Sequence, residues 1–317
     1  MHINLSTGIT VEAELTSPSD AGQNHSDGGN NLAIFLHPWS WLGGHMQDPV
    51  ASLLMDVFEA HRSQYYLLRY NSRGVGKSSG WPSLTGLSEG EDLRALVQWA
   101  FGTIRNIKSL VIVGYSHGSL IASLHSALPS TSTRVSHILL SYPLGPRGWL
   151  TAFRSNVYDT ALKDLLSSPE AHVLVVFGDQ DNFTSISKYE RWTKELQTLT
   201  GTDTQRLEIV RVDGASHFWR GRDERVLTAA VVERWLQRAT VIITVSFEYV
   251  GILSVAALPE IRQHTTAIQV TDPKGTLLLY YMSLSVSHCI RKLHKSMVTN
   301  MKLIFDCFIF KQSMLVS

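Results

Sequence analysis

The sequence has few of the features that would place it in a specialised class of protein. Only two of its 317 residues are cysteine, Cys289 and Cys307, which is too few for a disulfide framework, and neither has metal-ligand spacing. The 28 Lys and Arg residues nearly balance the 27 Asp and Glu residues, so no nucleic-acid partner is expected. The first fifteen residues lack the basic start and apolar run of a signal peptide. We therefore expect a reducing, cytoplasmic location.

The sequence also lacks a complete phosphate-binding loop. The glycine-rich stretch 71–80 reads NSRGVGKSSG, but Asn71 stands where a P-loop needs its first glycine. Ser79 stands where the dinucleotide-binding pattern needs its third glycine, and Trp81-Pro82 interrupts the helix that both motifs require. The stretch is therefore not predicted to bind a nucleotide, and no cofactor or metal is expected.

Short apolar runs alternate with helical patterns over most of the chain. Continuous apolar runs are typical of strands buried on both faces of a mainly parallel sheet. The predicted strands are 33–37, 66–70, 110–115, 137–141, 172–178 and 207–212, and the predicted helices are 47–61, 89–104, 118–127, 186–199 and 224–238. We expect an α/β fold, a doubly wound mainly parallel sheet flanked by helices. Residues 2–6 and 10–15 predict an antiparallel hairpin at its edge, and 16–31 a polar loop.

The composition changes near residue 239. All eight tryptophans precede this point, whereas both cysteines and four of the seven methionines follow it. We predict an α/β domain at 1–238 and an irregular carboxyl-terminal extension at 239–317. The extension holds three apolar stretches without clear helical or strand organisation, at 241–257, 276–287 and 303–310.

Three interpretations of the extension stay open. Residues 240–258 are nearly long enough to span a bilayer, but Glu248 near their centre argues against membrane association. The extension could instead be a small strand-rich unit, or a poorly ordered segment, even the product of a wrong gene model. We favour the last of these because the extension has no tryptophan and little glycine.

The motif that carries chemistry is Gly114-Tyr115-Ser116-His117-Gly118, a G-x-S-x-G pattern. A serine nucleophile at a sharp strand-to-helix turn needs very small residues two positions before and after it, so that strand and helix can approach. An apolar strand precedes this motif and a helical pattern follows it. We expect Gly114 and Gly118 to form a nucleophile elbow around Ser116.

Three later features supply the partners that a serine nucleophile needs. Strand 33–37 leads into His37-Pro38, and in such enzymes the loop after this strand donates one N–H group to the oxyanion hole. The oxyanion hole is predicted from the N–H groups of Trp39 and His117, with Ser40 as the alternative to Trp39. Asp179 and Asp181 follow strand 172–178, and His217 follows the last strand. The order Ser, Asp, His is the order of a catalytic triad in this kind of sheet.

Together these segments resemble the α/β-hydrolase superfamily, and within it the small, lid-poor serine hydrolases. The resemblance covers about residues 30–238 and rests on five segments in the expected order, which are HPxxxxGG at 37–44, NxRGVGxSxG at 71–80, GxSxG at 114–118, a late Asp, and a GAxHFFxG-like motif at 214–221. Ser72 and Trp219 each replace a phenylalanine of these motifs. The resemblance implies that stretch 71–80 is a loop near the rim of the active site.

The resemblance also ranks the candidate residues. The second Asp of a GDxD segment usually belongs to the triad in such families, so Asp181 is preferred and Asp179 is the alternative, expected to cap the next turn. Arg73 is expected to hold its loop by ion pairing, His37 and His45 to be structural, and the carboxylates at 89 and 91 to be an ordinary charged helix start.

The predicted activity is hydrolysis of an ester or related acyl bond, as in carboxylic ester hydrolases. Ser116 would be the nucleophile, His217 the general base and then acid, and Asp181 the residue that orients the histidine. Residues 142–170 could form only a small cap, which favours short or polar acyl substrates over long-chain lipids. A small-peptide serine peptidase and a non-catalytic binding protein of the same fold stay open. The oligomeric state cannot be predicted.

Overall fold

The computed structural model describes residues 1–18, 29–60, 65–126, 133–201, 205–255, 266–271 and 277–282, and beyond residue 238 it describes the backbone alone. The chain divides into two compact units, Met1–Ile242 and Ile243–Ser317. Most of the predicted polar loop 16–31, the apolar stretch 303–310 and both cysteines lie outside the described residues.

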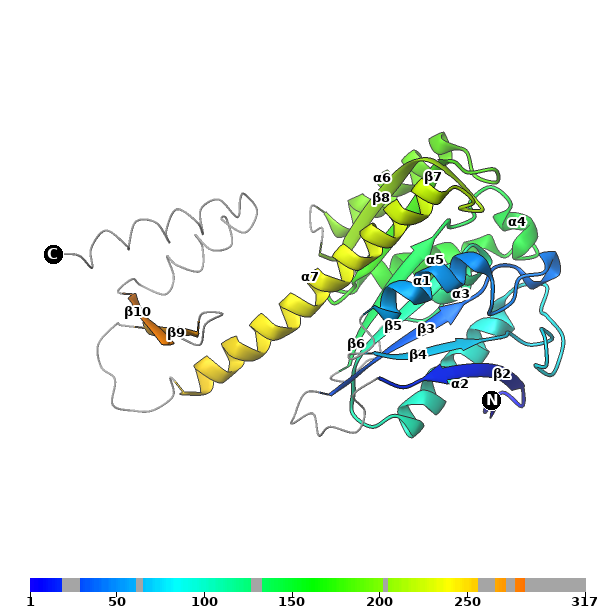
Figure 1. Cartoon of the computed structure of the whole chain (residues 1–317). Helices are drawn as coiled ribbons and strands as arrows, with labels where there is room; N and C mark the ends of the chain where they lie inside the picture. Colours follow the sequence, from blue (N-terminus) through cyan, green and yellow to red (C-terminus); the bar gives the residue numbers. More distant parts are fainter. Residues whose placement is uncertain are drawn as a thin grey trace. The chain divides into compact units, whose positions relative to one another are not determined.

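An eight-stranded sheet forms the centre of the first unit (Figure 1). Its strands are β1 His2–Asn4, β2 Thr10–Thr16, β3 Asn30–Leu36, β4 Tyr65–Tyr70, β5 Ile107–Tyr115, β6 Arg134–Leu140, β7 Val173–Gln180 and β8 Leu207–Ser216. They lie in the order β1-β2-β4-β3-β5-β6-β7-β8. Strands β1 and β2 form the antiparallel edge, and β3 to β8 run parallel. The mainly parallel sheet predicted from the sequence is confirmed.

The central position of β5 follows from its composition. Its neighbours in the sheet are β3 and β6, and eight of its nine residues are buried. A strand covered on both faces has no solvent-facing side to fill with polar residues, so it is a continuous apolar run rather than an alternating one. The carboxyl end of β5 therefore lies in the middle of the sheet edge, with loops on both sides of it.

Helices cover both faces of this sheet. They are α1 Pro49–Glu59, α2 Leu87–Thr103, α3 His117–Ser123, α4 Arg147–Leu150, α5 Ser155–Ser167, α6 Ile186–Thr200 and α7 Arg222–Val255, and a single 3-10 turn, η1, spans Ser40–Leu42. Apolar side chains of α1 and α7 pack in one core, on the face that is toward the viewer in Figure 1. Those of α2, α3, α5 and α6 pack in a second core on the opposite face. Both faces are thus closed, as the sequence predicted.

Segment 142–170 contains α4 and α5, which the hydrophobic pattern did not predict. Tyr158, Leu162, Leu165 and Leu166 of α5 are buried in the core. Helix α5 therefore belongs to the helical layer over the sheet, and Leu150 of α4 is buried in the same core, while Trp149 and Phe153 are exposed. This agrees with the expectation that the segment is too small to form a large lid.

The carboxyl-terminal region is more regular than its composition suggests. Helix α7 continues without a break from Arg222 through residue 238 to Val255, although no helical organisation was expected at 241–257. This stretch is rich in Val, Ile and Thr, whose weak helix propensity hides a helix from pattern analysis. In the second unit, β9 Thr266–Thr271 and β10 Leu277–Met282 form an antiparallel pair. The division at 238/239 stays a prediction.

The described helices were also compared with the requirements of a bilayer. None of them is long and apolar enough to cross a membrane.

Candidate active site

The turn from β5 to α3 places Ser116 in a strained backbone conformation. Its φ of 53° lies in the left-handed region that residues with side chains rarely adopt. A Cβ atom on Gly114 would lie 2.4 Å from the carbonyl oxygen of Gly118, and one on Gly118 would lie 2.5 Å from that of Leu36. Glycine at both positions lets the strand and the helix approach, which the elbow geometry requires. Ser116 is buried at this turn, with 7% of its surface exposed.

Ser116, His217 and Asp181 lie in hydrogen-bonding succession. The imidazole Nε2 of His217 is 2.9 Å from the Ser116 Oγ, and its Nδ1 is 2.7 Å from the Asp181 Oδ2. The side chains of His217 and Asp181 are 4% and 0% exposed. The loops after β5, β7 and β8 thus bring together three residues that lie far apart in the sequence.

The two candidate carboxylates have different partners. The Asp181 Oδ1 accepts hydrogen bonds from the backbone N–H groups of Phe183 and Thr184, both at 2.8 Å, while its Oδ2 faces the histidine. Asp179 instead accepts the N–H of Gly214 at 2.7 Å. The expectation that Asp179 caps the next turn is therefore wrong, because Asp181 caps that turn itself while holding the imidazole.

Aromatic side chains surround His217. The Tyr115 hydroxyl donates to the His217 carbonyl oxygen at 2.9 Å, which fixes the backbone of the loop. The rings of Phe183 and Phe218 stand edge-on to the imidazole, with centroids at 4.6 and 5.6 Å. Phe218 stands in the GAxHFFxG-like motif, whereas no motif singled out Phe183, whose only signal in the sequence was an aromatic residue close to Asp181.

The loop after β3 carries the predicted oxyanion donors. The Trp39 carbonyl accepts from the N–H groups of Leu42 and Gly44, which closes the η1 turn. Gly44 fits only without a Cβ, which would lie 2.2 Å from the Pro38 carbonyl oxygen. Within the part of the chain that the structure describes, the N–H groups of Trp39 and His117 donate to no protein acceptor. Both amides remain available to a ligand.

The histidine rings next to these amides are neutral structural groups. The His37 Nδ1 donates to the Pro38 carbonyl at 2.7 Å, and its Nε2 accepts from the Ser72 N–H at 3.0 Å and from the Ser72 hydroxyl at 2.7 Å. Ser72, which replaces a phenylalanine of the family motif, thus ties two loops together. Burial lowers the pKa of His37 to about 4 and that of His117 to about 3.

Stretch 71–80 is a loop between β4 and α2, as predicted. Arg73 forms two hydrogen bonds with the buried Asp92, at 2.7 and 2.8 Å, which agrees with the expected ion pair. Glu89 differs from the expected charged helix start. It is buried, and its carboxylate accepts from the N–H of Ser83 at 2.7 Å and from the Ser83 hydroxyl. This carboxylate closes the loop rather than facing solvent.

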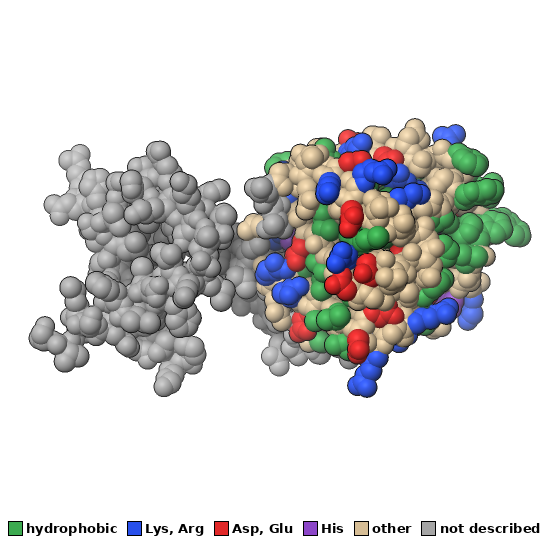
Figure 2. Space-filling model, turned by 90° about the horizontal axis from the view of Figure 1, so that it is seen from above, with side chains coloured by type: hydrophobic (Ala, Val, Ile, Leu, Met, Phe, Trp, Pro, Cys, Tyr) green, Lys and Arg blue, Asp and Glu red, His purple; other side chains and the backbone are tan. Residues whose placement is uncertain are grey.

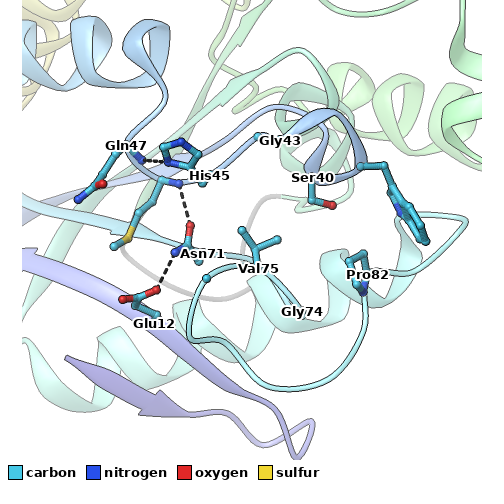
Figure 3. Close-up of a pocket in the computed structure, with 13 residues that line it drawn as sticks. Glu12, Ser40, Gly43, His45, Gln47, Asn71, Gly74, Val75 and Pro82 are labelled. Carbon is cyan, nitrogen blue, oxygen red and sulfur yellow. Dashed lines mark hydrogen bonds between the residues drawn. The ribbon is translucent and has the colours of Figure 1, made fainter.

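A cavity of about 540 Å³ lies between this loop and the loop after β3 (Figure 3). Ser40, Asn71 and Glu12 are among its lining residues, and the Asn71 amide donates to the Glu12 carboxylate at 2.8 Å. The triad residues do not line it. The η1 turn, Ser40–Leu42, borders both the cavity and the candidate site, but the side chains that could carry out catalysis lie outside the cavity.

The described ranges hold no cluster of metal ligands. Nowhere in them do three or more His, Cys, Asp or Glu side chains gather as they would around an ion. The arrangement at Ser116 matches nucleophilic chemistry assisted by a base and by backbone amides.

Similar proteins were found by sequence and by structure. No family model matches the chain. An uncharacterized protein of Rickettsia prowazekii (strain Madrid E) is 27% identical over 199 residues, which cover 61% of this chain and 74% of that protein.

Three solved structures illustrate the structural likeness. XC6422 of Xanthomonas campestris, described as an α/β serine hydrolase without lid, matches with a TM-score of 0.56 and 21% identity over 75% of this chain and 93% of its own. Est1E of Butyrivibrio proteoclasticus, solved with ferulic acid, has a TM-score of 0.59 and 18% identity over 75% and 98%. The Pyrococcus furiosus esterase Pf2001 has a TM-score of 0.53 and 18% identity over 75% and 89%. The chain therefore has the α/β-hydrolase fold.

Proposed function

We propose that this protein is a serine hydrolase that cleaves an ester or related acyl bond of a small substrate, as carboxylic ester hydrolases do. The observation that carries the proposal is the succession of hydrogen bonds from Ser116 to His217 to Asp181, at 2.9 and 2.7 Å. A hydroxyl, an imidazole and a buried carboxylate in this order form the constellation that activates a serine nucleophile.

In the first half of the reaction, the His217 Nε2 takes the proton of the Ser116 hydroxyl as the oxygen attacks the substrate carbonyl. The resulting oxyanion would accept hydrogen bonds from the N–H groups of Trp39 and His117. One such donor typically contributes about 3–4 kcal/mol of transition-state stabilisation. The imidazolium then protonates the leaving alkoxide, and the acyl group stays on Ser116.

Water completes the cycle. The His217 Nε2 accepts a proton from a water molecule that attacks the acyl carbonyl, and returns it to the Ser116 oxygen as the acid leaves. Asp181 holds the Nδ1–H tautomer throughout. Its second oxygen is bound by two backbone amides, which prevents the carboxylate from turning away.

The substrate is expected to be small. In segment 142–170, α5 and Leu150 of α4 pack in the core, so little of the segment remains to cover the site, which supports short or polar acyl groups. The likeness to Est1E, which binds ferulic acid, adds aromatic acyl esters to the substrates worth testing. With only two cysteines in the chain, a reducing compartment remains the expected location.

The proposal is tested by labelling with a serine-reactive fluorophosphonate. The wild-type protein should label, and Ser116→Ala should not, although both should show the same circular dichroism spectrum. Ser119→Ala is the matched control, because this neighbouring serine is also buried in the elbow and its hydroxyl donates to the Ser116 carbonyl.

Labelling of Ser116→Ala at the wild-type rate, or of neither protein, would contradict the assignment. Hydrolysis of p-nitrophenyl acetate, p-nitrophenyl butyrate and methyl ferulate by the unlabelled wild-type enzyme would rank the acyl groups. Cleavage of small peptides without any of these esters would assign a peptidase instead.

A further inference from the structure

Large apolar side chains are exposed on the loops around the candidate site. We call this set the aromatic rim, and its members are Trp41, Leu42, Trp81, Leu84, Trp149, Phe153, Phe183 and Phe218. They lie on the loops that follow β3, β4, β6, β7 and β8. Since β5 lies between β3 and β6 in the sheet, the rim occupies loops on both sides of Ser116.

The distribution of these side chains is uneven. Over the described residues, all six exposed Trp and Phe side chains belong to the aromatic rim. Figure 2 shows hydrophobic side chains gathered at one end of the molecule, the end at which Figure 1 labels α4. Single exposed apolar residues are normal on any protein, but a cluster of large ones at one end marks an interaction surface.

The α4 turn holds two rim residues outward in a defined conformation. Trp149 is 78% exposed and Phe153 is 77% exposed, and their rings lie 6.0 Å apart. Ala152 and Phe153 both have positive φ values, 45° and 64°. Such conformations cost about 1–3 kcal/mol each, so they persist only where the surroundings impose them.

Hydrogen bonds impose the conformation of this turn. The Phe153 N–H donates to the Gly148 carbonyl at 2.6 Å, and Arg147 at the start of α4 forms two hydrogen bonds with Asp159 of α5, at 2.6 and 2.9 Å. The exposed rings are therefore positioned by the fold and are not the tip of a frayed loop.

The loop that carries Trp81 is held as firmly. Trp81 is 86% exposed, the largest fraction of any large hydrophobic residue described. On its two sides, the Ser79 N–H donates to the Thr10 carbonyl at 2.8 Å, and the Ser83 N–H donates to Glu89 at 2.7 Å. The Tyr158 hydroxyl of α5 donates to the Thr85 carbonyl at 2.6 Å, which links this loop to the helix beside α4.

The aromatic rim extends to the candidate catalytic histidine. Phe183 and Phe218 contact the His217 ring and are 38% and 40% exposed. The guanidinium of Arg220 lies 4.8 Å from the centre of the Phe218 ring, and Arg154 follows Phe153 directly and is exposed. Arginine beside exposed aromatic rings suits a surface that offers both hydrocarbon and phosphate groups.

We propose that the aromatic rim docks on the surface of a phospholipid bilayer and holds the active site against it. Trp, Phe and Leu on a rigid, partly basic surface are the residues that partition into the interface of a membrane. A protein partner or a second copy seated on the rim would cover the approach to Ser116 from both sides. A lipid surface does not block that approach, because esters dissolved in the bilayer can reach Ser116 directly from the surface on which the rim is docked.

The test is co-sedimentation with sucrose-loaded phosphatidylcholine vesicles. The full chain is used as Ser116→Ala, so that binding is measured without turnover and does not depend on the proposed catalytic role. We expect this protein to sediment with the vesicles, and the added triple change Trp81→Ser, Trp149→Ser, Phe153→Ser to lower the partition coefficient about tenfold or more. Leu199→Ser is the matched control, an exposed apolar residue of α6 outside the rim.

Three results would overturn the proposal. The first is a parent protein that stays in the supernatant at millimolar lipid, and the second is a triple variant that sediments as the parent does. The third is sedimentation velocity that finds the parent to be a dimer and the triple variant a monomer, which would assign the rim to a contact between copies of the chain. Because all three changed side chains are largely exposed, the triple variant should keep the thermal midpoint of its parent.

Discussion

Mild acid is expected to unfold this protein, because buried histidines must stay neutral in the folded chain. Burial lowers the pKa to about 4 in His37 and His125, and to about 3 in His117, His137 and His172. In the unfolded chain the same side chains titrate near pH 6.5. Below that pH the unfolded chain binds protons that the folded chain cannot, so the stability present above about pH 6.5 is lost as the pH falls toward 4.

The size of the effect follows from the width of that window. Between about pH 7.5 and pH 5.5, one histidine that is neutral in the folded state and titrates near 6.5 when unfolded removes about 1.3 kcal/mol from the free energy of unfolding. Five such histidines remove about 6.5 kcal/mol, which is comparable with the whole stability of an ordinary domain, about 5–15 kcal/mol. The protein should therefore unfold, or come close to unfolding, near pH 5.5.

His172 offers a variant that isolates one of these titrations. Its ring stacks on Trp235 with centroids 4.2 Å apart, and its Nδ1 is 3.0 Å from the Ser136 hydroxyl oxygen. His172→Phe keeps a flat ring against the indole and removes the proton-binding group. Between pH 7.5 and pH 5.5, the free energy of unfolding of the variant should fall by about 1.3 kcal/mol less than that of the wild type. This difference does not depend on the stability of the variant at neutral pH.

The assay is urea unfolding followed by tryptophan fluorescence at several pH values. Plots of unfolding free energy against pH should fall steeply below about pH 6.5 in the wild type, with a shallower slope in His172→Phe. An unfolding free energy that is flat from pH 7.5 to 5.5, or the same slope in both proteins, would refute the idea that buried neutral histidines control acid stability.

Two further predictions concern the site. Asp181→Asn should lower kcat by about 10⁴-fold in an ester hydrolysis assay, because the imidazole loses the acceptor that sets its tautomer, whereas Asp179→Asn should lower it less than about tenfold; equal losses would mean that the two carboxylates share the role. Gly114→Ala should reduce the free energy of unfolding by about 3 kcal/mol or more, since the new Cβ would meet a carbonyl oxygen at 2.4 Å. Gly102→Ala, at an open position on α2, should instead raise it by about 0.5–1 kcal/mol, and similar effects of the two changes in urea unfolding would argue against the close approach at the elbow.

Most of the sheet could be predicted because its strands are buried on both faces. Residues 110–115 of strand β5 form an almost continuous apolar run, and such a run can be recognised in the sequence without tertiary information. Helix α5 escaped prediction although its buried residues recur at helical spacing, since it follows a turn with two positive-φ residues, Ala152 and Phe153, that no local pattern reveals. Local periodicity predicts elements, but the positive φ values of this turn and the hydrogen bonds from Arg147 to Asp159 do not show in it.

The candidate site also contains residues that a short segment identifies and residues whose roles depend on the folded chain. Ser116 and His217 were identified because the residues beside them must be small or must follow a strand, which are constraints within a short segment. The difference between Asp179 and Asp181 depends on which backbone N–H groups donate to each carboxylate, and Asp179 accepts from Gly214 of β8, about 35 residues away in sequence. Glu89 was misjudged because it stands in the first turn of α2, as expected, but is buried there as the acceptor of the Ser83 N–H.

Backbone strain at the sheet edge shows how the site is held. Ser116, Ser141 and Trp219 have positive φ values of 53°, 50° and 48° and follow β5, β6 and β8. The indole N–H of the buried Trp219 donates to the Ser141 hydroxyl at 2.9 Å, so two strained residues stabilise each other behind His217. A phenylalanine, which the family motif has at 219, could not make this bond. The departure from the motif is therefore compensated by Ser141, a residue directly after β6 that only the folded chain brings within reach.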